Sequence, residues 1–273
     1  MTLILGMSKA EGIYLSVDYR VTNSQTGETL DDASVKFLTV RYPPDKEGPN
    51  ALLAYTGIAQ LPDGTPVGDW LRETLRGQTE VIDASMQHLH QRLNRDLARY
   101  RVGLIVNVLV VHGDQRYAGG FTNIEADGSV ARSFEYVMDE LTKPFVFANG
   151  SGAARAVAGG HLNLLREQLN VRPRRVHNHM KLLATLNRRV AKVENSVSPH
   201  CHVSFINAND QYEPTYEVFV ERGESVSFQM PMIWMGIDVS YVMEQFMRDV
   251  QAGTTPFPAL DSDEVNKHLR RRS

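Results

Sequence analysis

The chain has 273 residues, of which 42% are hydrophobic and 22% charged, and its formal net charge is −3. This length suits one large α/β domain, or one domain with an added lobe, and so weak a charge predicts neither a nucleic-acid nor a membrane partner. The single cysteine, Cys201, cannot form an intrachain disulfide, which fits a reducing cytoplasm. No signal-like segment opens the sequence and no apolar run reaches about 18 residues, so we expect a cytoplasmic protein.

The first 22 residues predict a β-hairpin. Two apolar, β-prone runs, residues 1–6 and 11–22, are joined by a polar turn at residues 8–12. Thr2 is the second residue, and removal of the initiator methionine would leave a free α-amine beside its hydroxyl. Such an amine can act as general base toward the hydroxyl of its own residue. Thr2 is therefore a candidate nucleophile; the plainer alternative is a hairpin with an incidental threonine.

Two charged residues are candidates to support Thr2. A hairpin folds the chain back on itself, so Asp18 can lie beside Thr2 on the neighbouring strand. A third β-prone run, residues 33–40, carries Lys36, and a lysine in the middle of a strand must reach solvent or find a carboxylate partner. Asp18 is the natural partner. Lys36 held near Thr2 would favour deprotonation of the α-amine and the hydroxyl.

These residues resemble the start of the proteasome β-type subunits, the N-terminal-threonine (Ntn) peptidases. The resemblance is carried by Thr2, by the DYRVT run at residues 18–22 and by Lys36. That family opens with a threonine exposed by processing, followed by an Asp at the same spacing, an Arg-small-Thr run and a lysine on the next strand. Here the lysine stands a few residues later, which a longer turn at residues 25–32 would explain. The similarity covers roughly residues 2–210, and its specific motifs are concentrated in the first sixty.

An apolar strand predicted at residues 50–59 runs into a glycine turn at Gly57. In the family, a glycine at this point donates its backbone N–H to the oxyanion, and a glycine does let the backbone approach a scissile carbonyl. The resemblance therefore implies that Gly57 is the oxyanion donor. The alternative is that Gly57 merely ends the strand.

The same match implies a substrate-binding set. Val21, Tyr55 and Ala59 would line a restricted, apolar pocket for a substrate side chain. Thr22 would offer backbone groups to an extended peptide, which would add as a strand. Arg20, in the same run, is assigned to this set as well.

The middle of the chain predicts alternating helices and strands. A helical pattern runs from residue 69 to about residue 100, with an interruption at Gly77. Residues 102–112 are the most apolar run and predict a central strand buried on both faces, with a hairpin partner at residues 115–125. A further short strand is expected at residues 130–136. Strands flanked by helices in this order fit a four-layer αββα sandwich of the Ntn-hydrolase type.

Two later segments complete the candidate site. Residues 145–152 read as a strand that ends in Gly-Ser-Gly before an alanine-rich helix, similar to the family segment beside the nucleophile, so Ser151 is a candidate to hydrogen-bond the Thr2 amine. In the loop at residues 194–206, Ser198 takes the place of a family serine. The family Asp falls on Asn195, which would contribute less electrostatically. Alternatively the loop is offset and Glu194 replaces it.

The C-terminal part goes beyond the simplest subunit of this family. It predicts strands at residues 216–220 and 226–230, a helix at residues 239–250, then a Pro-containing linker and a polar tail. We therefore divide the chain into a proteasome-like Ntn-hydrolase domain, residues 1–210, and an extension of strands, one helix and a polar tail packed on the same domain, residues 211–273.

The resemblance implies a threonine peptidase subunit of a self-compartmentalising assembly. Its substrate would be a peptide or unfolded protein, its partners further copies in a homo-oligomeric ring and an ATP-driven unfoldase, and it would need no metal or other cofactor. Two alternatives stay open. One is a catalytically inactive structural or assembly subunit of the same fold, which Asn195 favours. The other is an Ntn amidohydrolase acting on small amides, which would share Thr2 but form no ring.

Overall fold

The computed structural model describes residues 2–23, 26–42, 50–78, 81–171, 175–208, 215–221, 223–224 and 231–252. The chain forms two compact units, Met1–Asp238 and Val239–Ser273. In the second unit, α6 (Val239–Gln251) forms where a helix was predicted. The strand predicted at residues 226–230 and the linker and tail predicted from residue 254 lie outside the described residues. Within the described ranges, no helix is both long and apolar enough to cross a lipid bilayer.

The N-terminal hairpin lies inside a five-stranded sheet whose neighbours all run antiparallel, in the order β10-β1-β2-β11-β12. Its strands are β1 (Ile4–Lys9), β2 (Gly12–Asp18), β10 (Phe145–Asn149), β11 (Cys201–Asn207) and β12 (Thr215–Phe219). Every residue of β1 and β2 is buried, because strands lie on both sides of the hairpin. The predicted hairpin is confirmed, with Ile4 opposite Val17.

The second sheet has seven strands in the order β14-β13-β5-β6-β7-β8-β9. They are β5 (Phe37–Arg41), β6 (Asn50–Gly57), β7 (Leu104–His112), β8 (Gln115–Ile124), β9 (Val130–Glu140), β13 (Met232–Trp234) and β14 (Ile237–Asp238). The prediction that Lys36 lies in the middle of a strand was wrong, since β5 begins one residue after it. The turn expected at residues 25–32 contains a short strand, β4 (Thr29–Asp31), which pairs with β3 (Val21–Thr22).

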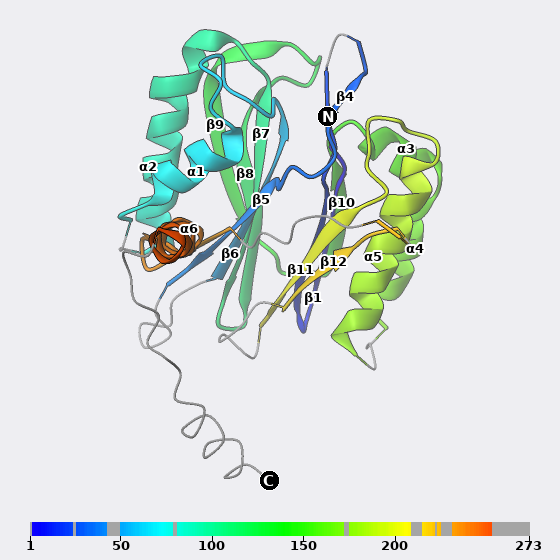
Figure 1. Ribbon diagram of the computed structural model, residues 1–273. Helices are drawn as coiled ribbons and strands as arrows, with labels where there is room; N and C mark the ends of the chain where they lie inside the picture. Colours follow the sequence, from blue (N-terminus) through cyan, green and yellow to red (C-terminus); the bar gives the residue numbers. More distant parts are fainter. Residues whose placement is uncertain are drawn as a thin grey trace. The chain divides into compact units, whose positions relative to one another are not determined.

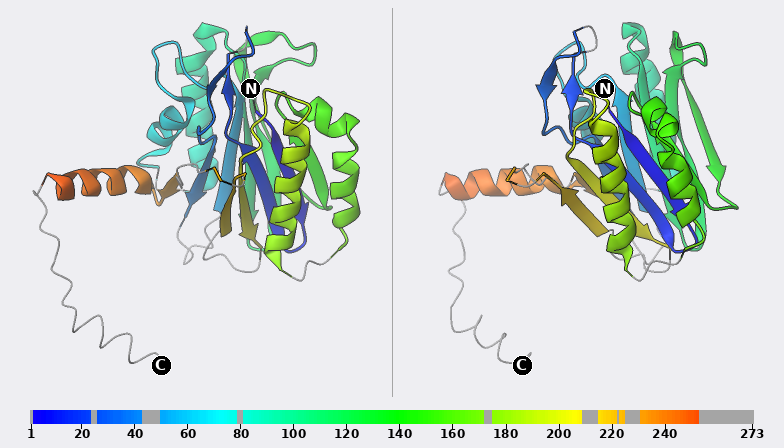
Figure 2. Two further views of the ribbon diagram at one scale, coloured as in Figure 1. Left: turned by 45° about the vertical axis from the view of Figure 1, so that its right-hand side comes forward. Right: turned by 90° about the vertical axis from the view of Figure 1, so that its right-hand side faces the viewer.

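Helices cover the outer face of each sheet (Figures 1 and 2). Outside the seven-stranded sheet lie α1 (Val67–Leu75) and α2 (Ile82–Arg92), which continues as the π-helical turn Leu93–Leu97 and the 3-10 turn Ala98–Tyr100. Outside the five-stranded sheet lie α3 (Ala153–Ala158), α4 (His161–Gln168) and α5 (Val176–Ala191). The interruption predicted at Gly77 is confirmed, since this residue falls between α1 and α2.

Alternate residues of the strands form separate cores, as the two-residue period of a strand requires. On β6, Leu53 and Tyr55 belong to the cluster beneath α1 and α2, whereas Leu52 and Ala54 face a cluster between the sheets. That inner cluster also contains Leu15 and other residues of the hairpin. The fold is thus a mixed α/β fold in which two large sheets face one another, and the end of the hairpin that carries Thr2 is held between them.

Candidate active site

Asp18, the last residue of β2, connects three segments through its buried carboxylate. Its Oδ1 accepts a hydrogen bond from the Leu3 main-chain nitrogen at 2.7 Å. Its Oδ2 accepts from the main-chain nitrogens of Arg20, at 3.0 Å, and Ser198, at 2.9 Å. The hairpin register explains the first contact, because the Asp18 nitrogen in turn donates to the Leu3 carbonyl at 3.2 Å. Leu3 therefore lies opposite Asp18, just before β1 begins, and Thr2 is the residue that precedes it in the chain.

Lys36 supplies the buried counter-charge. Its ammonium lies 3.6 Å from Asp18 Oδ1 and also donates to the Arg20 carbonyl, and only 2% of the side chain is exposed. The expected ion pair with Asp18 is confirmed. Burial lowers the pKa of the Lys36 ammonium, although the Asp18 carboxylate acts in the opposite direction. Both side chains of the pair are buried, and buried charges interact more strongly than charges at a surface.

Thr2 is buried and its main chain is held by the Gly-Ser-Gly segment after β10. The Thr2 nitrogen donates to Ser151 Oγ at 3.2 Å, as predicted from the sequence. The Thr2 carbonyl accepts from the Gly152 nitrogen at 3.4 Å. Gly150 has φ +87°, and a Cβ on it would lie 2.1 Å from the Thr2 carbonyl oxygen. Only glycine allows this approach, so the segment is matched to Thr2.

A second serine and a glutamate extend this contact, and sequence reasoning missed the serine. Ser151 Oγ lies 3.0 Å from Ser196 Oγ, and Ser196 Oγ donates to Glu194 Oε1 at 2.7 Å. The Ser196 nitrogen also donates to Glu194 Oε1, at 3.2 Å, in a local turn that the Glu-x-Ser spacing would have indicated. These hydrogen bonds lower the pKa of Glu194. Asn195 and Glu194 were both considered for the position of the family Asp. Glu194 is the one whose side chain connects to Ser151, through Ser196.

Asn195 and Ser198 have other partners. The Asn195 carbonyl accepts from Arg20 Nη1 at 2.9 Å. Ser198 is buried, and its main chain reaches Asp18, as described above, while its Oγ accepts from the His200 nitrogen at 3.1 Å. Ser198 thus contacts Asp18, whereas Ser196 contacts Ser151, which accepts from the Thr2 nitrogen.

Arg20 joins the loops around the site. Its guanidinium forms a two-pronged contact with Asp32, Nε to Oδ1 at 3.2 Å and Nη2 to Oδ2 at 2.7 Å. Burial alone would raise the pKa of Asp32, but hydrogen bonds from Arg20 and Ser198 hold it below its ordinary value. Beyond Arg20, Val21 and Thr22 form β3, where Val21 is half-buried and Thr22 buried.

Gly57 is exposed at the end of β6, with φ +110°, and a Cβ on it would lie 2.1 Å from the Gly103 carbonyl oxygen. The position is therefore closed to any other residue. Its neighbour Thr56 extends toward the loop that holds Thr2, because Thr56 Oγ1 lies 3.0 Å from where a Cβ on Gly150 would be. The end of β6 and the Gly-Ser-Gly segment thus come together at Thr2.

Tyr55 and Ala59 lie on the α1 side of this strand end. Tyr55 is 4% exposed in the core beneath α1, and its hydroxyl donates to the Val35 carbonyl at 3.3 Å. Burial raises the pKa of the Tyr55 phenol. Ala59 is half-buried, and its carbonyl accepts from the Val67 nitrogen, the first residue of α1, at 2.9 Å. Both residues thus help to dock α1 next to Gly57.

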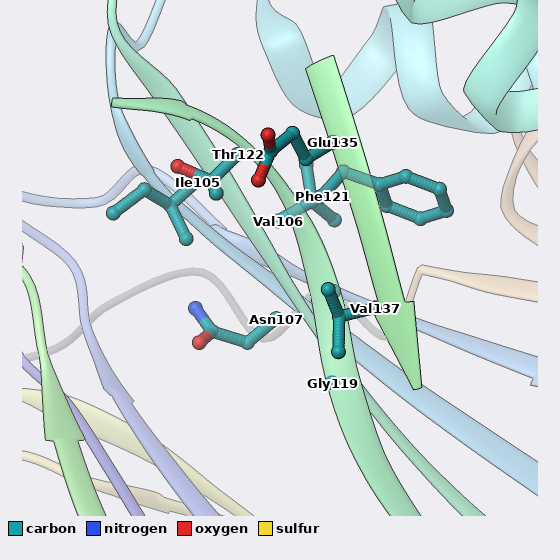
Figure 3. A pocket seen from close by; sticks show the side chains of 9 residues that line it. Ile105, Val106, Asn107, Gly119, Phe121, Thr122, Glu135 and Val137 are labelled. Carbon is teal, nitrogen blue, oxygen red and sulfur yellow. The ribbon is translucent and has the colours of Figure 1, made fainter. Parts of the chain in front are cut away.

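A cavity of about 210 Å³ lies across β7, β8 and β9. It is lined by Ile105, Val106, Asn107, Gly119, Gly120, Phe121, Thr122, Glu135 and Val137. Figure 3 shows the Phe121 ring pointing away from the side on which Asn107 and Ile105 lie. Asn107 Oδ1 accepts from Asn149 Nδ2 at 2.9 Å, and Asn149 Oδ1 accepts from the Gly150 nitrogen at 2.7 Å. Two hydrogen bonds therefore connect the cavity wall to the glycine that abuts Thr2.

In the part of the chain that the structure describes, no group of three or more His, Cys, Asp or Glu side chains is arranged to hold a metal ion. His202, on β11, stacks on Phe37 with ring centroids 3.7 Å apart. Burial lowers the pKa of the His202 imidazole to about 3 and raises the pKa of the Cys201 thiol to about 12. Both groups are therefore neutral core residues near neutral pH.

No family model matches this sequence, and no curated protein matches it. Among solved structures, a Gly-1 mutant of Anbu from Hyphomicrobium sp. strain MC1 has a similar fold, with a TM-score of 0.52 and 12% sequence identity. The match covers 95% of this chain and 100% of that chain. At this identity the likeness concerns the overall fold alone.

Proposed function

We propose that this chain is an N-terminal-threonine hydrolase with a four-layer αββα fold, and that Thr2 cleaves peptide bonds once the Met1–Thr2 bond has been cut. The observation that carries the proposal is the set of contacts around Thr2. On one side, the buried Asp18–Lys36 pair is bonded to the main chain of Leu3. On the other, Ser151 accepts from the Thr2 nitrogen. That nitrogen, here a peptide nitrogen, stands for the α-amine of the processed chain.

In the proposed reaction the α-amine takes the proton of the Thr2 hydroxyl, and Oγ1 attacks the scissile carbonyl. The Lys36 ammonium, held by Asp18, favours the ionised hydroxyl electrostatically. The Gly57 N–H is the proposed donor to the oxyanion. As the C–N bond breaks, the leaving amine receives the proton and an ester remains on Thr2. Water, deprotonated by the same α-amine, then hydrolyses this ester and frees the enzyme.

Substrate binding is assigned to the segments that flank this site. Thr22, in β3, would pair with an extended peptide through its main chain. Arg20 supports β3 through its contact with Asp32. Val21 and Ala59 would flank the path of the bound peptide, and Tyr55 would lie beneath it. The cavity on β7–β9 offers a second, largely apolar recess. We further propose that the substrate is a polypeptide, that the chain forms a homo-oligomeric ring and that an ATP-driven unfoldase is a partner. These three proposals are supported by the proteasome-like fold and the sequence resemblance alone.

The decisive test begins with a chain whose first residue is Thr2, made by cleaving an amino-terminal tag. A peptide aldehyde blocks, and a β-lactone acylates, an activated threonine. Intact mass should show one lactone adduct on this chain, and peptide mapping should place it on Thr2. The variant Thr2→Ala should show none. Thr185→Ala, which removes an exposed hydroxyl on α5, should label like the unmodified chain.

Intact mass of the protein made without a tag shows whether residue 1 is removed in the cell. Native mass then separates a ring from a smaller oligomer. Equal labelling of Thr2→Ala, or no labelling of the folded Thr2-first chain, would overturn the proposal and leave an assembly subunit of the same fold. Labelling together with turnover of small amides but not peptides would favour the amidohydrolase.

A further inference from the structure

The two sheets end at different places on one side of the fold. β10 is the last strand of the five-stranded sheet, whereas the seven-stranded sheet continues past β7 with β8 and β9. Asn149, on β10, donates through Nδ2 to Oδ1 of Asn107, on β7, at 2.9 Å, so β10 lies above β7. Within the described residues, the five-stranded sheet therefore has no strand above the inner face of β8 and β9. Val137 shows the consequence, because it is apolar and lies on this face, yet 54% of it is exposed.

The strand register places two rows of side chains on this uncovered face. They run from β7 across β8 to β9 and consist of Ile105, Thr122 and Glu135, then Asn107, Gly120 and Val137. Gly120 has no side chain, so the second row has a gap in its centre, and the cavity of about 210 Å³ lies there. A Cβ on Gly120 would lie 2.0 Å from the Val106 carbonyl oxygen, so the backbone itself keeps this gap open. Sites for drug-sized molecules begin at about 300 Å³, so the cavity suits a single long side chain.

Two carboxylates give this face a negative charge. Glu135 lies in the cavity wall, and Figure 3 shows its carboxylate on the side of the sheet where Asn107 lies. Asp139 is on the same face, because residues that are four apart in a strand point to the same side. Within the described residues neither carboxylate is in an ion pair, while Arg116, on the same face, donates to the Lys9 carbonyl. A Lys or Arg side chain, with its apolar stem and cationic end, would therefore match both the walls and the charge of the cavity.

The outer edge of β10 can hold a chain that carries such a residue. In the part of the protein that the structure describes, only β1 pairs with β10, so the other edge of β10 has no strand partner. An unpaired edge accepts an extended peptide as a further strand. Adjacent strands are about 4.8 Å apart in any sheet, so a strand added to β10 would lie above β8, with alternate side chains directed at the cavity.

We propose that this groove, between the outer edge of β10 and the inner face of β8 and β9, binds an extended segment of a polypeptide substrate. A Lys or Arg side chain of that segment enters the cavity above Gly120 and pairs with Glu135. The connection to the nucleophile is short, because Asn149 ends β10 and its Oδ1 accepts from the nitrogen of Gly150, which abuts Thr2. The identification of the segment as substrate rests on the proposed function, whereas the binding itself does not.

Peptide binding to the full chain with the change Thr2→Ala tests the groove without any turnover. The probe is a Thr-Val-Lys-Val-Thr-Val peptide with an N-terminal fluorescein and a C-terminal amide, and two comparison peptides carry norleucine or Glu in place of Lys. Norleucine keeps the apolar stem and lacks the charge. Fluorescence anisotropy should give a Kd about fivefold lower for the Lys peptide than for the norleucine peptide, the size expected for a partly exposed ion pair. The Glu peptide should bind more weakly than either.

Three variants of this chain locate the binding. Glu135→Gln should abolish the preference for the Lys peptide, and Val137→Phe, which fills the cavity, should weaken the binding of all three peptides. Glu140→Gln is the matched control, since Glu140 is on the same strand but points to the opposite face, and it should leave each Kd unchanged. A thermal melt of each variant checks its fold. Failure of the Lys peptide to bind, or an unchanged preference in folded Glu135→Gln, would overturn the inference.

Native mass tests the alternative occupant of the groove, which is a second copy of the chain. Addition of the Lys peptide should leave the oligomer mass unchanged apart from the bound peptide. If Val137→Phe dissociates an oligomer and the Lys peptide does not bind, the groove is a contact between copies and the inference is overturned.

Activity distinguishes a failure of this inference from a failure of the proposed function. On the Thr2-first chain, Glu135→Gln should raise the KM for unfolded casein, a lysine-containing polypeptide, about fivefold. If the Lys peptide binds but the Thr2-first chain shows no lactone labelling, the groove stands and the proposed function fails. If the chain is labelled and hydrolyses casein but no peptide binds, the inference is overturned and the proposed function stands. An unchanged KM beside normal peptide binding would show that the bound segment is not substrate, which also overturns the inference.

Discussion

The carboxylate of Asp18 accepts a hydrogen bond at 2.9 Å from the main-chain nitrogen of Ser198, which lies 180 residues further along the chain. The same carboxylate accepts from Leu3 and contacts Lys36, as described above. A single buried side chain thus connects the hairpin, the approach to β5 and the loop before β11. This connection makes the stability of the fold and the geometry around Thr2 depend on the same group.

Asp18→Asn should therefore destabilise the protein as well as inactivate it. The amide can still accept from Leu3, but its nitrogen cannot accept from Ser198 or Arg20, and Lys36 loses its counter-charge. Breaking a buried pair of this kind costs about 3 kcal/mol. Urea unfolding should show the loss, whereas Asp139→Asn, at an exposed position of β9, should change the free energy of unfolding by less than about 0.5 kcal/mol. Equal stabilities of the two variants would contradict this account.

The Lys36 ammonium should set the alkaline limb of activity. Burial lowers its pKa from 10.5, so kcat/KM should fall with rising pH before that value is reached. Lys36→Arg keeps the positive charge at alkaline pH, because a guanidinium does not lose its proton there, and should abolish the limb even if the rate is lower. Lys181→Arg, on the exposed face of α5, should leave the profile unchanged. An identical alkaline limb in Lys36→Arg would show that another group titrates.

Gly57→Ala should disrupt the end of β6 by steric overlap, apart from any effect on an oxyanion. The added Cβ would lie 2.1 Å from the Gly103 carbonyl oxygen, in a backbone conformation with φ +110°. Gly128 is the matched control, since it has φ +84° but nothing within 4 Å of an added Cβ. Gly128→Ala should cost about 1 kcal/mol for the positive φ alone, and Gly57→Ala more than about 2 kcal/mol. Thermal unfolding of the two variants measures these losses. Equal losses of unfolding free energy would mean that the end of β6 shifts to make room for the added methyl group.

The Arg20–Asp32 contact should contribute to stability in a defined pH range. The folded-state pKa of Asp32 lies below its ordinary value of 3.8, so the ionised carboxylate stabilises the fold above about pH 4. This contribution is lost as the pH falls through the lower, folded-state pKa. Because the pair is partly exposed, solvent screening should limit it to less than about 1 kcal/mol.

Unfolding of Asp32→Asn in urea at pH 6 and at pH 2.5 tests this range. The variant should be less stable than the unmodified protein at pH 6, and the difference should shrink at pH 2.5, where the Asp32 carboxyl of the unfolded chain is protonated. Asp139→Asn should show no such change between the two pH values. A difference that grows as the pH falls would mean that Asp32 destabilises the fold when ionised.

The elements that could be predicted are those whose signal is local. The hairpin, the long strand at β7 and the break at Gly77 follow from the two-residue and 3.6-residue periods and from a helix-breaking glycine. Lys36 was placed in the middle of a strand because its neighbours are β-prone, yet β5 begins only at Phe37, although the Lys36 carbonyl already accepts from the Tyr55 nitrogen of β6 at 3.1 Å. The short strands β13 and β14 were missed because each has too few residues to show a period.

Taken alone, the sequence indicated that Asp18 and Lys36 would pair, because strand alternation and hairpin register are properties of short segments and a buried lysine must find a carboxylate. Ser151 became a candidate partner of the Thr2 nitrogen only through the family resemblance. Only the tertiary structure decided which loop residue continues from Ser151. In the folded protein Ser196 connects Ser151 to Glu194, and the Ser198 nitrogen donates to Asp18. These contacts could not be predicted, because the conformation of a loop depends on the strands and helices packed around it.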